Sequence, residues 1–249
     1  MIAPGGTAGI AVSRVSHAYG KKQALAEVEF TASKGRFTAL LGPNGAGKST
    51  LFSLLTRLFA ARDGRIFIDG IDLAAQPRQA LSRIGVVFQQ PTLDLDLTVR
   101  RNLRYFAALQ GLWGSEAERR IDAALERLDM AERSGERARD LNGGHRRRTE
   151  IARALLHGPS VLLLDEPTVG LDAASRASIT EHVHELCADQ DISVLWATHL
   201  VDEVRSDDHL VILHQGRVLA ENDAGTIADG APLAERFLAL TAEDAETAP

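Results

Sequence analysis

The chain has 249 residues, with 28 Lys and Arg against 34 Asp and Glu, which gives a formal net charge of −6. A hydrophobic fraction of 45% and a charged fraction of 25% are ordinary for a folded globular protein and exclude a disordered one. The acidic balance also argues against a nucleic-acid partner, because duplex binders usually have a basic surface.

The beginning of the chain resembles neither a leader nor a membrane anchor. Residues 1–9 are small and polar, lack the basic and apolar regions of a signal peptide, and are expected to be flexible. Apolar runs such as residues 161–164 are far shorter than the ~20 residues that span a bilayer. Cys187 is the only cysteine, so it is expected to be a small buried apolar side chain. These features favour the cytoplasm.

Short apolar runs along the chain predict strands at residues 10–15, 37–41, 84–88, 161–164, 193–197 and 210–213. The runs VLLL and SVLWA are apolar throughout, which is typical of strands buried on both faces of a parallel sheet. The segment GRIFIDGIDL instead alternates and contains two Asp-Gly turn signals. It is expected to belong to a smaller antiparallel sheet.

Helices are predicted from the spacing of apolar residues. One apolar face follows Lys48 and consists of Leu51, Leu54, Leu55, Leu58 and Phe59. A second face consists of Ile179, Val183, Leu186 and Cys187. Residues 99–130 are charge-rich and helical without a strand candidate, so they predict an all-helical lobe, and a short helix is expected near residues 231–240. Trp113 and Trp196 are interpreted as packing residues.

The segment between the second predicted strand and the first helix fits the phosphate-binding pattern G-x-x-x-x-G-K-[ST] at every fixed position. It consists of Gly42, Pro43, Asn44, Gly45, Ala46, Gly47, Lys48 and Ser49, and Thr50 follows it. The glycines let successive N–H groups turn toward phosphate oxygens at the positive end of a helix dipole. Lys48 is expected to reach the β- and γ-phosphates, and Ser49 to ligate Mg²⁺. The sequence therefore predicts a nucleoside triphosphate site.

Two carboxylates, Asp165 and Glu166, close the apolar run at residues 161–164. A buried strand rarely ends in this way unless a cation or a reaction requires it. Because side chains alternate along a strand, the two carboxylates are expected to point to different sides. Asp165 could then hold Mg²⁺ while Glu166 faces the γ-phosphate and polarises a water. The alternative is a pair of solvated charges before the turn at Pro167.

At this point the chain, over about residues 10–219, resembles the ATP-binding cassette (ABC) family, as the nucleotide-binding subunit of a transporter. The segment of Leu141, Asn142, Gly143, Gly144 and His145 occupies the place of the family signature LSGGQ. The other motifs are similar to family elements in the family's order: Tyr19 to the adenine-stacking aromatic, Gln89 to the Q-loop glutamine, Gly170, Leu171 and Asp172 to the D-loop, and His199 to the switch histidine.

The resemblance implies an α/β fold: a P-loop NTPase core of mostly parallel sheet flanked by helices. A small antiparallel β subdomain and an inserted α-helical subdomain, at about residues 92–145, are expected with it. The ATPase domain would cover residues 10–220, and a short C-terminal helix and tail residues 221–249.

The resemblance also implies a mechanism. ATP and Mg²⁺ would be the cofactors, and two subunits would dimerise head to tail on ATP, so that each signature meets the partner's phosphate loop. Glu166 would act as general base, with Lys48 and His199 as further catalytic groups at the γ-phosphate. Ser49, Gln89 and Asp165 would hold Mg²⁺, and Gln89 would also report to a membrane partner.

The signature departs from the family pattern, because Asn142 replaces Ser and His145 replaces Gln. The Asn amide can still donate a hydrogen bond to an anionic oxygen, and both glycines are present. Three arginines, Arg146, Arg147 and Arg148, follow and are expected to keep this helix start electropositive. We expect a competent site; the alternative is a site that binds ATP but turns it over slowly.

A chain with these motifs could have one of three functions. It could be a transport ATPase, a soluble ABC ATPase that acts on ribosomes or DNA, or a non-catalytic ATP-gated scaffold. A single phosphate loop and a short interval before the signature, without a heptad run or cysteine cluster, favour transport. A scaffold would lack Glu166 or His199. The expected partner is a separate integral-membrane permease at the cytoplasmic face of the inner membrane, and no nucleic acid is expected. The run QQPTLDLDLTVRRNLRYFAALQGL is similar to drug-resistance and nodulation exporters, so export is favoured.

Overall fold

The computed structural model describes residues 8–247, with side chains up to residue 242. Most of the N-terminal segment expected to be flexible lies outside the described residues. Its last two positions, Ala8 and Gly9, belong instead to the first strand, β1 (Ala8–Tyr19). At the other end, residues 248 and 249 of the expected tail lie outside the described part of the chain.

The main sheet has six strands, in the order β10-β9-β3-β8-β7-β6. Neighbouring strands pair in parallel from β9 to β6, and β10 runs antiparallel to β9 at one edge. The strands are β3 (Phe37–Leu41), β6 (Ile84–Val87), β7 (Val161–Asp165), β8 (Ser193–Thr198), β9 (His209–His214) and β10 (Arg217–Asp223). Because the carboxyl ends of parallel strands meet at one edge, this edge is where such folds place a ligand site.

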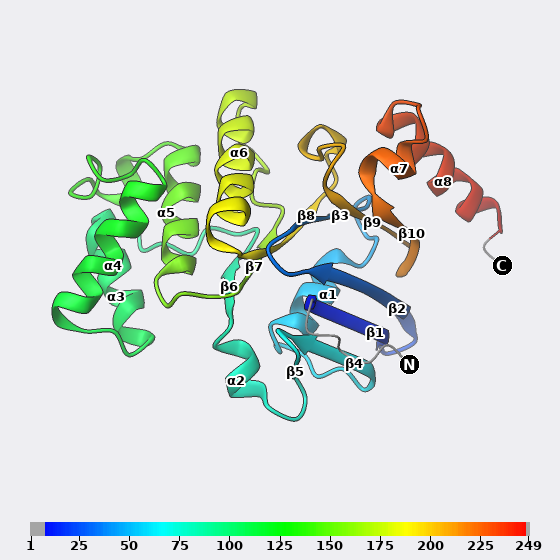
Figure 1. Ribbon diagram of the computed structural model, residues 1–249, viewed down its shortest axis with the longest axis horizontal. Helices are drawn as coiled ribbons and strands as arrows, with labels where there is room; N and C mark the ends of the chain where they lie inside the picture. Colours follow the sequence, from blue (N-terminus) through cyan, green and yellow to red (C-terminus); the bar gives the residue numbers. More distant parts are fainter. Residues whose placement is uncertain (1–7, 248–249) are drawn as a thin grey trace.

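A second, smaller sheet is antiparallel throughout, in the order β2-β1-β4-β5. Its remaining strands are β2 (Lys22–Ser33), β4 (Asp63–Ile68) and β5 (Ile71–Asp72). Figure 1 shows this sheet below the main one, with helix α1 (Lys48–Leu55) beside it. Leu51, Phe52, Leu54 and Leu55 of α1 belong to the core cluster that also contains side chains of both sheets.

Every residue of β7 is buried, and its side chains alternate between two cores. Val161 and Leu163 belong to the core beside α1, whereas Leu162 and Leu164 belong to the core on the opposite face. This arrangement explains why the run is apolar throughout: both faces of the strand are covered.

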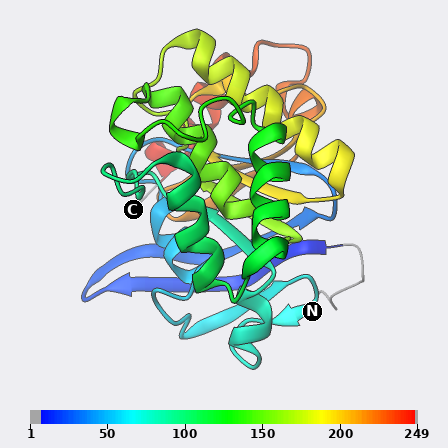
Figure 2. The same cartoon turned by 90° about the vertical axis from the view of Figure 1, so that its left-hand side faces the viewer.

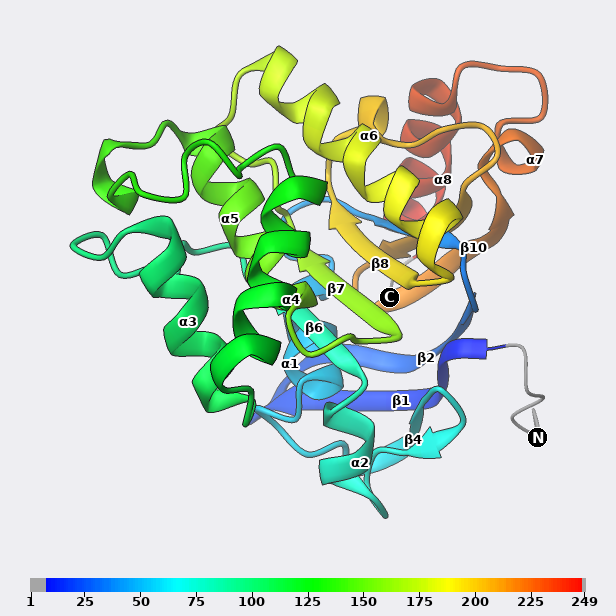
Figure 3. The ribbon, with the colours of Figure 1, turned by 60° about the vertical axis from the view of Figure 1, so that its left-hand side comes forward.

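The inserted helices gather at one end of the molecule. Figures 2 and 3 show α3 (Val99–Leu109), α4 (Gly114–Arg127) and α5 (Gly143–Leu155) side by side. The other helices are α2 (Pro77–Leu81), α6 (Ala173–Gln190), α7 (Ala224–Ala228) and α8 (Leu233–Thr247). The α/β fold expected from the sequence is therefore confirmed. Within residues 8–247, no helix has both the length and the apolar character needed to cross a membrane.

Two expectations about apolar residues are wrong. The helix after Lys48 ends at Leu55, because Arg57 takes a left-handed φ of 60°, and Leu58 is 65% exposed. Trp196 is fully buried as expected, but Trp113 is 69% exposed, since it precedes α4 just after the left-handed turn at Gly111. Cys187 is buried, and this burial raises the pKa of its thiol to about 12.

Candidate functional site

The phosphate loop joins the carboxyl end of β3 to α1. Gly45 and Gly47 have left-handed φ angles of 84° and 112°, a conformation that glycine adopts without strain. A Cβ at Gly47 would lie 2.7 Å from the Leu25 side chain and 2.9 Å from the Ala24 carbonyl oxygen. Gly47 caps α1 without a side-chain hydrogen bond. The first N–H groups of the helix are thus left for an anion.

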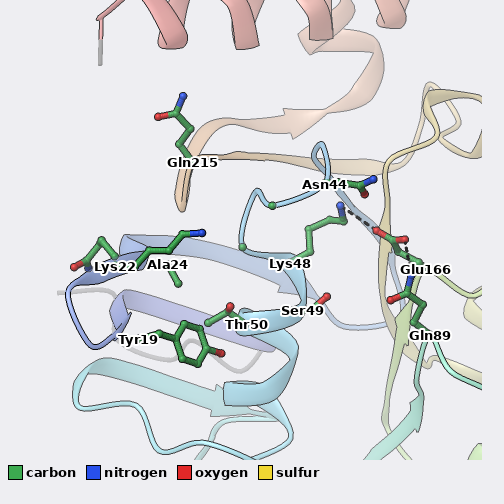
Figure 4. A pocket seen from close by; sticks show the side chains of 13 residues that line it. Tyr19, Lys22, Ala24, Asn44, Lys48, Ser49, Thr50, Gln89, Glu166 and Gln215 are labelled. Carbon is green, nitrogen blue, oxygen red and sulfur yellow. Dashed lines mark hydrogen bonds and ion pairs between the residues drawn. The ribbon is translucent and has the colours of Figure 1, made fainter. Parts of the chain in front are cut away.

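A cavity of about 550 Å³ opens over this loop, and Figure 4 shows the side chains around it. It brings together nine of the residues predicted from the sequence: Tyr19, Asn44, Gly45, Gly47, Lys48, Ser49, Thr50, Gln89 and Glu166. A volume of this size is in the range of small-molecule sites.

Lys48 points into the cavity toward Glu166, although it lies in the first turn of α1. Its Nζ donates to the carbonyl oxygens of Gly42 (2.7 Å) and Pro43 (3.2 Å) and lies 3.1 Å from Glu166 Oε1. Both charged side chains are largely buried. The Lys48 ammonium is thus bonded to groups of its own chain. A bound phosphate could replace these groups as its partners.

Glu166 stands immediately after β7 in a left-handed conformation, with a φ of 46°. Such strain in a residue other than glycine is frequent at functional sites. The Glu166 N–H donates to the carbonyl oxygen of Ala197 (3.0 Å), which holds this turn against β8. Its Oε2 accepts from Gln89 Nε2 (3.3 Å) and lies 3.5 Å from His199 Nδ1. The three predicted side chains therefore converge.

Asp165, the last residue of β7, is buried, and the Ser49 hydroxyl lies beside its carboxylate. Burial, and then repulsion from Glu166, raise the pKa of Asp165 to about 6, above its ordinary value of 3.8. Asp165 Oδ1 has no hydrogen-bond partner. A buried carboxylate in this state is stabilised by a cation.

Together with Ser49 and Gln89, Asp165 offers oxygen ligands of the kind that Mg²⁺ prefers. No group of three or more His, Cys, Asp or Glu capable of holding a metal occurs in the described part of the chain. The donor set therefore fits an ion that takes few protein ligands and completes its shell with phosphate and water oxygens.

Tyr19 stands at the open side of the cavity and is 47% exposed. Its ring packs edge-on against His17 and Phe59, with centroids 4.8 and 5.8 Å away. These neighbours brace the ring while leaving part of it accessible, as stacking on a planar base requires.

Four lining residues were missed by the sequence reasoning: Lys22, Gln23, Ala24 and Gln215. Three belong to β2, which was not predicted, and Gln215 lies in the β9–β10 turn with a φ of 46°. The sequence contains one signal for these residues, the basic pair of Lys21 and Lys22, since a lysine near a phosphate site is a candidate anion ligand.

The segment similar to the family signature lies outside the cavity lining. Asn142 caps α5, and its side-chain oxygen accepts from the His145 N–H (2.8 Å). This cap uses only the oxygen of the amide, so the NH₂ group remains available as a donor. Asn142 and Gly143 are exposed, and burial lowers the pKa of His145, with Arg133 and Arg148 adding to the effect. The helix start is open to an external ligand.

Asp172 is also outside the cavity lining and lies close to the signature. Its carboxylate caps α6 by accepting from the Ser175 N–H (2.9 Å) and hydroxyl (2.7 Å). A Cβ at Gly144 would lie 3.0 Å from the same Ser175 hydroxyl. The small residue at position 144 therefore allows the two helix starts to meet.

The expected electropositive character of Arg146, Arg147 and Arg148 is only partly realised, because their guanidinium groups bond to their own chain. Arg146 donates to backbone carbonyls at residues 138 and 139. Arg147 is buried against Glu150, and Arg148 bonds to Ser178 and Asp129. The run is mainly a set of internal hydrogen-bond donors.

Comparison with known proteins agrees with this geometry. The sequence model of the family described as ABC transporter matches residues 25–169. The linearmycin resistance ATP-binding protein LnrL of Bacillus subtilis is 36% identical over 207 residues, which cover 83% of this chain and 66% of the relative. The Nod factor export ATP-binding protein I of Rhizobium meliloti is 38% identical over 216 residues, with 86% and 64% covered. The chain thus spans about two thirds of the length of these relatives.

Solved structures are similar over nearly the whole chain. An ATP-binding subunit of an ABC transporter has a TM-score of 0.80 and 31% identity, with 93% of this chain and 99% of that chain covered. The dimeric structure of a bacterial ABC transporter cassette has a TM-score of 0.76 and 27% identity, covering 86% and 98%. A dimeric post-hydrolysis state bound to ADP and Pi scores 0.75 at 26% identity, with 86% and 98% covered.

Proposed function

Since this chain belongs to the ABC transporter family, we propose that it is an ATP-binding and ATP-hydrolysing subunit that dimerises head to tail on ATP and powers a separate membrane permease in export. The observation that carries the proposal is the convergence of Lys48, Gln89, Glu166 and His199 over one phosphate loop, while the exposed start of α5 lies elsewhere. The cavity thus offers one half of a site, and the signature offers the other half.

ATP binding begins with an exchange of partners at Lys48. In the free protein its ammonium bonds to two loop carbonyls and to Glu166. The β- and γ-phosphates would take over these bonds, and the N–H groups at the start of α1 would donate to the same oxygens. Glu166, released from Lys48, then becomes a free carboxylate near the terminal phosphate.

For hydrolysis, the attacking water would lie between Glu166 and the γ-phosphorus. Glu166 accepts a proton from the water as its oxygen bonds to phosphorus, and the bond from the γ-phosphorus to the ADP oxygen breaks. His199, 3.5 Å from Glu166 Oε2, is near enough to donate to the γ-phosphate. A general base of this kind is worth about 10² to 10⁴ in rate.

Mg²⁺, held by Ser49, Asp165 and Gln89, would neutralise charge on the phosphate oxygens when bound. The raised pKa of Asp165 and its unpartnered Oδ1 support this assignment.

The signature would act on the ATP of a partner subunit. Asn142 and Gly143 are exposed at the start of α5, where N–H groups and the helix dipole favour an anion. A head-to-tail pair would bring this helix start to the partner's γ-phosphate. The dimeric cassette among the similar structures supports the formation of a pair.

The permease would dock on the helical lobe, at the cytoplasmic face of the inner membrane. A groove of about 300 Å³ runs between β6 and α3, lined by Phe88, Thr92, Phe106, Arg153 and His157 among others. Tyr105, Leu109 and Trp113 are exposed on the same lobe. Large apolar side chains that are exposed on one lobe favour a protein contact there. The names of the resistance and Nod factor export relatives support export.

Titration calorimetry with Mg-ATP tests the phosphate-loop assignment. Lys48→Ala should weaken binding and abolish phosphate release, because the fold provides no other buried ammonium over the loop among the described residues. Lys34→Ala removes a lysine that pairs with Asp69 and is 41% exposed, so it should bind like wild type. Wild-type affinity in Lys48→Ala would defeat the assignment.

A further inference from the structure

Helix α5 contains a buried ion pair one turn beyond the signature. Arg147 Nη1 lies 2.8 Å from Glu150 Oε2, and the two side chains are 7% and 2% exposed. Burial lowers the pKa of Arg147, whereas the carboxylate of Glu150 raises it. Neither residue lines the nucleotide cavity. The sequence indicated Arg147 only as part of the basic run after the signature, and it did not indicate Glu150 or the pair.

Arg147 and Glu150 form hydrogen bonds to both limbs of the loop that carries Gln89. Arg147 donates to the carbonyl oxygens of Phe88 (2.8 Å) and Gln89 (3.0 Å) on the incoming limb. Glu150 Oε1 accepts from the N–H of Thr92 (2.7 Å) on the outgoing limb. The backbone of this exposed loop is therefore fixed by side chains of α5 and not by loop-to-loop hydrogen bonds alone.

These hydrogen bonds connect two functional elements that are distant in sequence: the signature at the start of α5 and the Gln89 loop. At 1.5 Å of rise per residue, Arg147 lies about 7.5 Å along α5 from the signature residue Asn142. On the other side of Arg147, the Gln89 side chain contacts the proposed base, because its Nε2 donates to Glu166 Oε2 (3.3 Å). A continuous path thus runs from the start of α5, through Arg147 and the Gln89 backbone, to the carboxylate proposed as the base.

Stability alone does not account for a buried pair at this place. Removing two charges from water costs several kcal/mol per ion, and well-packed hydrophobic residues often serve as well or better. What apolar residues cannot do is hold three backbone groups of a loop at fixed positions. The forked guanidinium of Arg147 does so for two neighbouring carbonyls.

We propose that Arg147 and Glu150 are positioning residues that make the Gln89 loop move as one body with the signature helix. When a second subunit's nucleotide engages the start of α5, the pair would carry that displacement to Gln89 and so set its contact with Glu166. The inference rests on the proposed ATPase function and deepens it, because it names the link between a subunit's signature and its own hydrolytic site.

The test uses the double variant Arg147→Met/Glu150→Met, since either single removal would strand a buried charge. Turnover at saturating Mg-ATP should fall about 10- to 100-fold, as for small misplacements in an active site. The dissociation constant for Mg-ATP, from calorimetry, should not change. Arg147→Lys keeps the charge beside Glu150 but loses the fork, so it should show a smaller loss in the same direction.

A combination with Gln89→Ala separates positioning from general damage. If the pair acts through Gln89, breaking it in the Gln89→Ala background should cost no further turnover. The matched control Glu116→Met/Arg120→Met removes a half-exposed ion pair of α4 in the same lobe and should keep wild-type turnover.

Wild-type turnover in the Arg147→Met/Glu150→Met variant, or a loss that multiplies in full with the Gln89→Ala loss, would overturn the inference. Failure of the wild-type protein to release phosphate from ATP would instead defeat the proposed function.

Discussion

At the scale of single residues, the site is built around two consecutive buried acids with different partners. Glu166 is paired with the Lys48 ammonium. Asp165 has only the Ser49 hydroxyl beside it, and its Oδ1 has no hydrogen-bond partner. Asp165 therefore has a pKa of about 6 in the folded protein, against 3.8 for an ordinary aspartate. Its contribution to stability is fully present at low pH and is lost as the pH rises through 6.

Replacing Asp165 with the uncharged Asn should stabilise the protein in buffer that contains EDTA and no nucleotide. At pH 7.5 the ionised Asp165 costs the native state up to about 3 kcal/mol, so the uncharged variant should melt several degrees higher than wild type. Thermal denaturation followed by circular dichroism from pH 4.5 to 7.5 measures the difference. The gap should shrink toward low pH; a variant that melts lower at pH 7.5 would contradict the burial of this charge.

The residues that chemistry dictates were predictable from the sequence. A phosphate cradle needs glycines, a lysine and a hydroxyl in fixed order, and the two acids follow a strand that is unmistakably apolar. Ala24 and Gln215 were not predictable, because they reach the cavity through hairpin backbone: a Cβ at Gly216 would lie 2.5 Å from the Ala24 carbonyl oxygen. That approach depends on how two sheets meet, which no local pattern records.

At the scale of elements, the start of α5 shows why an altered signature still folds. Asn and Ser are equally good N-cap residues, so Asn142 supplies the same hydrogen bond to the third N–H of the helix that a serine would.

Asn142→Ala should lower the free energy of unfolding by about 1 kcal/mol, whereas Asn142→Ser should leave it nearly unchanged. Urea denaturation of the two variants measures this directly. Equal destabilisation by both substitutions would show that the cap is not the stabilising feature at this position.

Other elements escaped prediction for physical reasons. In β2 the buried residues Leu25 and Val28 are three apart, because Glu27 forms a bulge with a φ of 50° and breaks the two-residue period. Helix α1 stops early at a left-handed arginine, whose guanidinium donates to the carbonyl oxygen of Leu73 (3.0 Å). Neither the bulge at Glu27 nor the end of α1 near Arg57 is marked by a glycine or a proline, so neither could be predicted from a turn residue.

At the scale of the whole molecule, the signature does not line the nucleotide cavity, and we propose that the two complete a site between two copies of the chain. The lobe that holds the signature also carries exposed Tyr105, Leu109 and Trp113. Nucleotide chemistry and membrane docking are therefore expected to be separable by mutation.

The double variant Tyr105→Ser/Trp113→Ser should keep the phosphate release of the isolated chain, because neither side chain lines the nucleotide cavity. In cells that also produce the proposed permease, the variant should no longer sediment with membranes. Membrane sedimentation equal to wild type would assign the docking surface to another face.

The variant Glu166→Gln tests most directly whether Glu166 is the base for ATP hydrolysis between two copies of this chain. Glu166→Gln should keep the nucleotide cradle but lose the base, so Mg-ATP should convert a monomer into a long-lived dimer in light scattering, with phosphate release reduced about 10² to 10⁴-fold. A Glu166→Gln protein that stays monomeric in Mg-ATP, or that releases phosphate at the wild-type rate, would contradict the account.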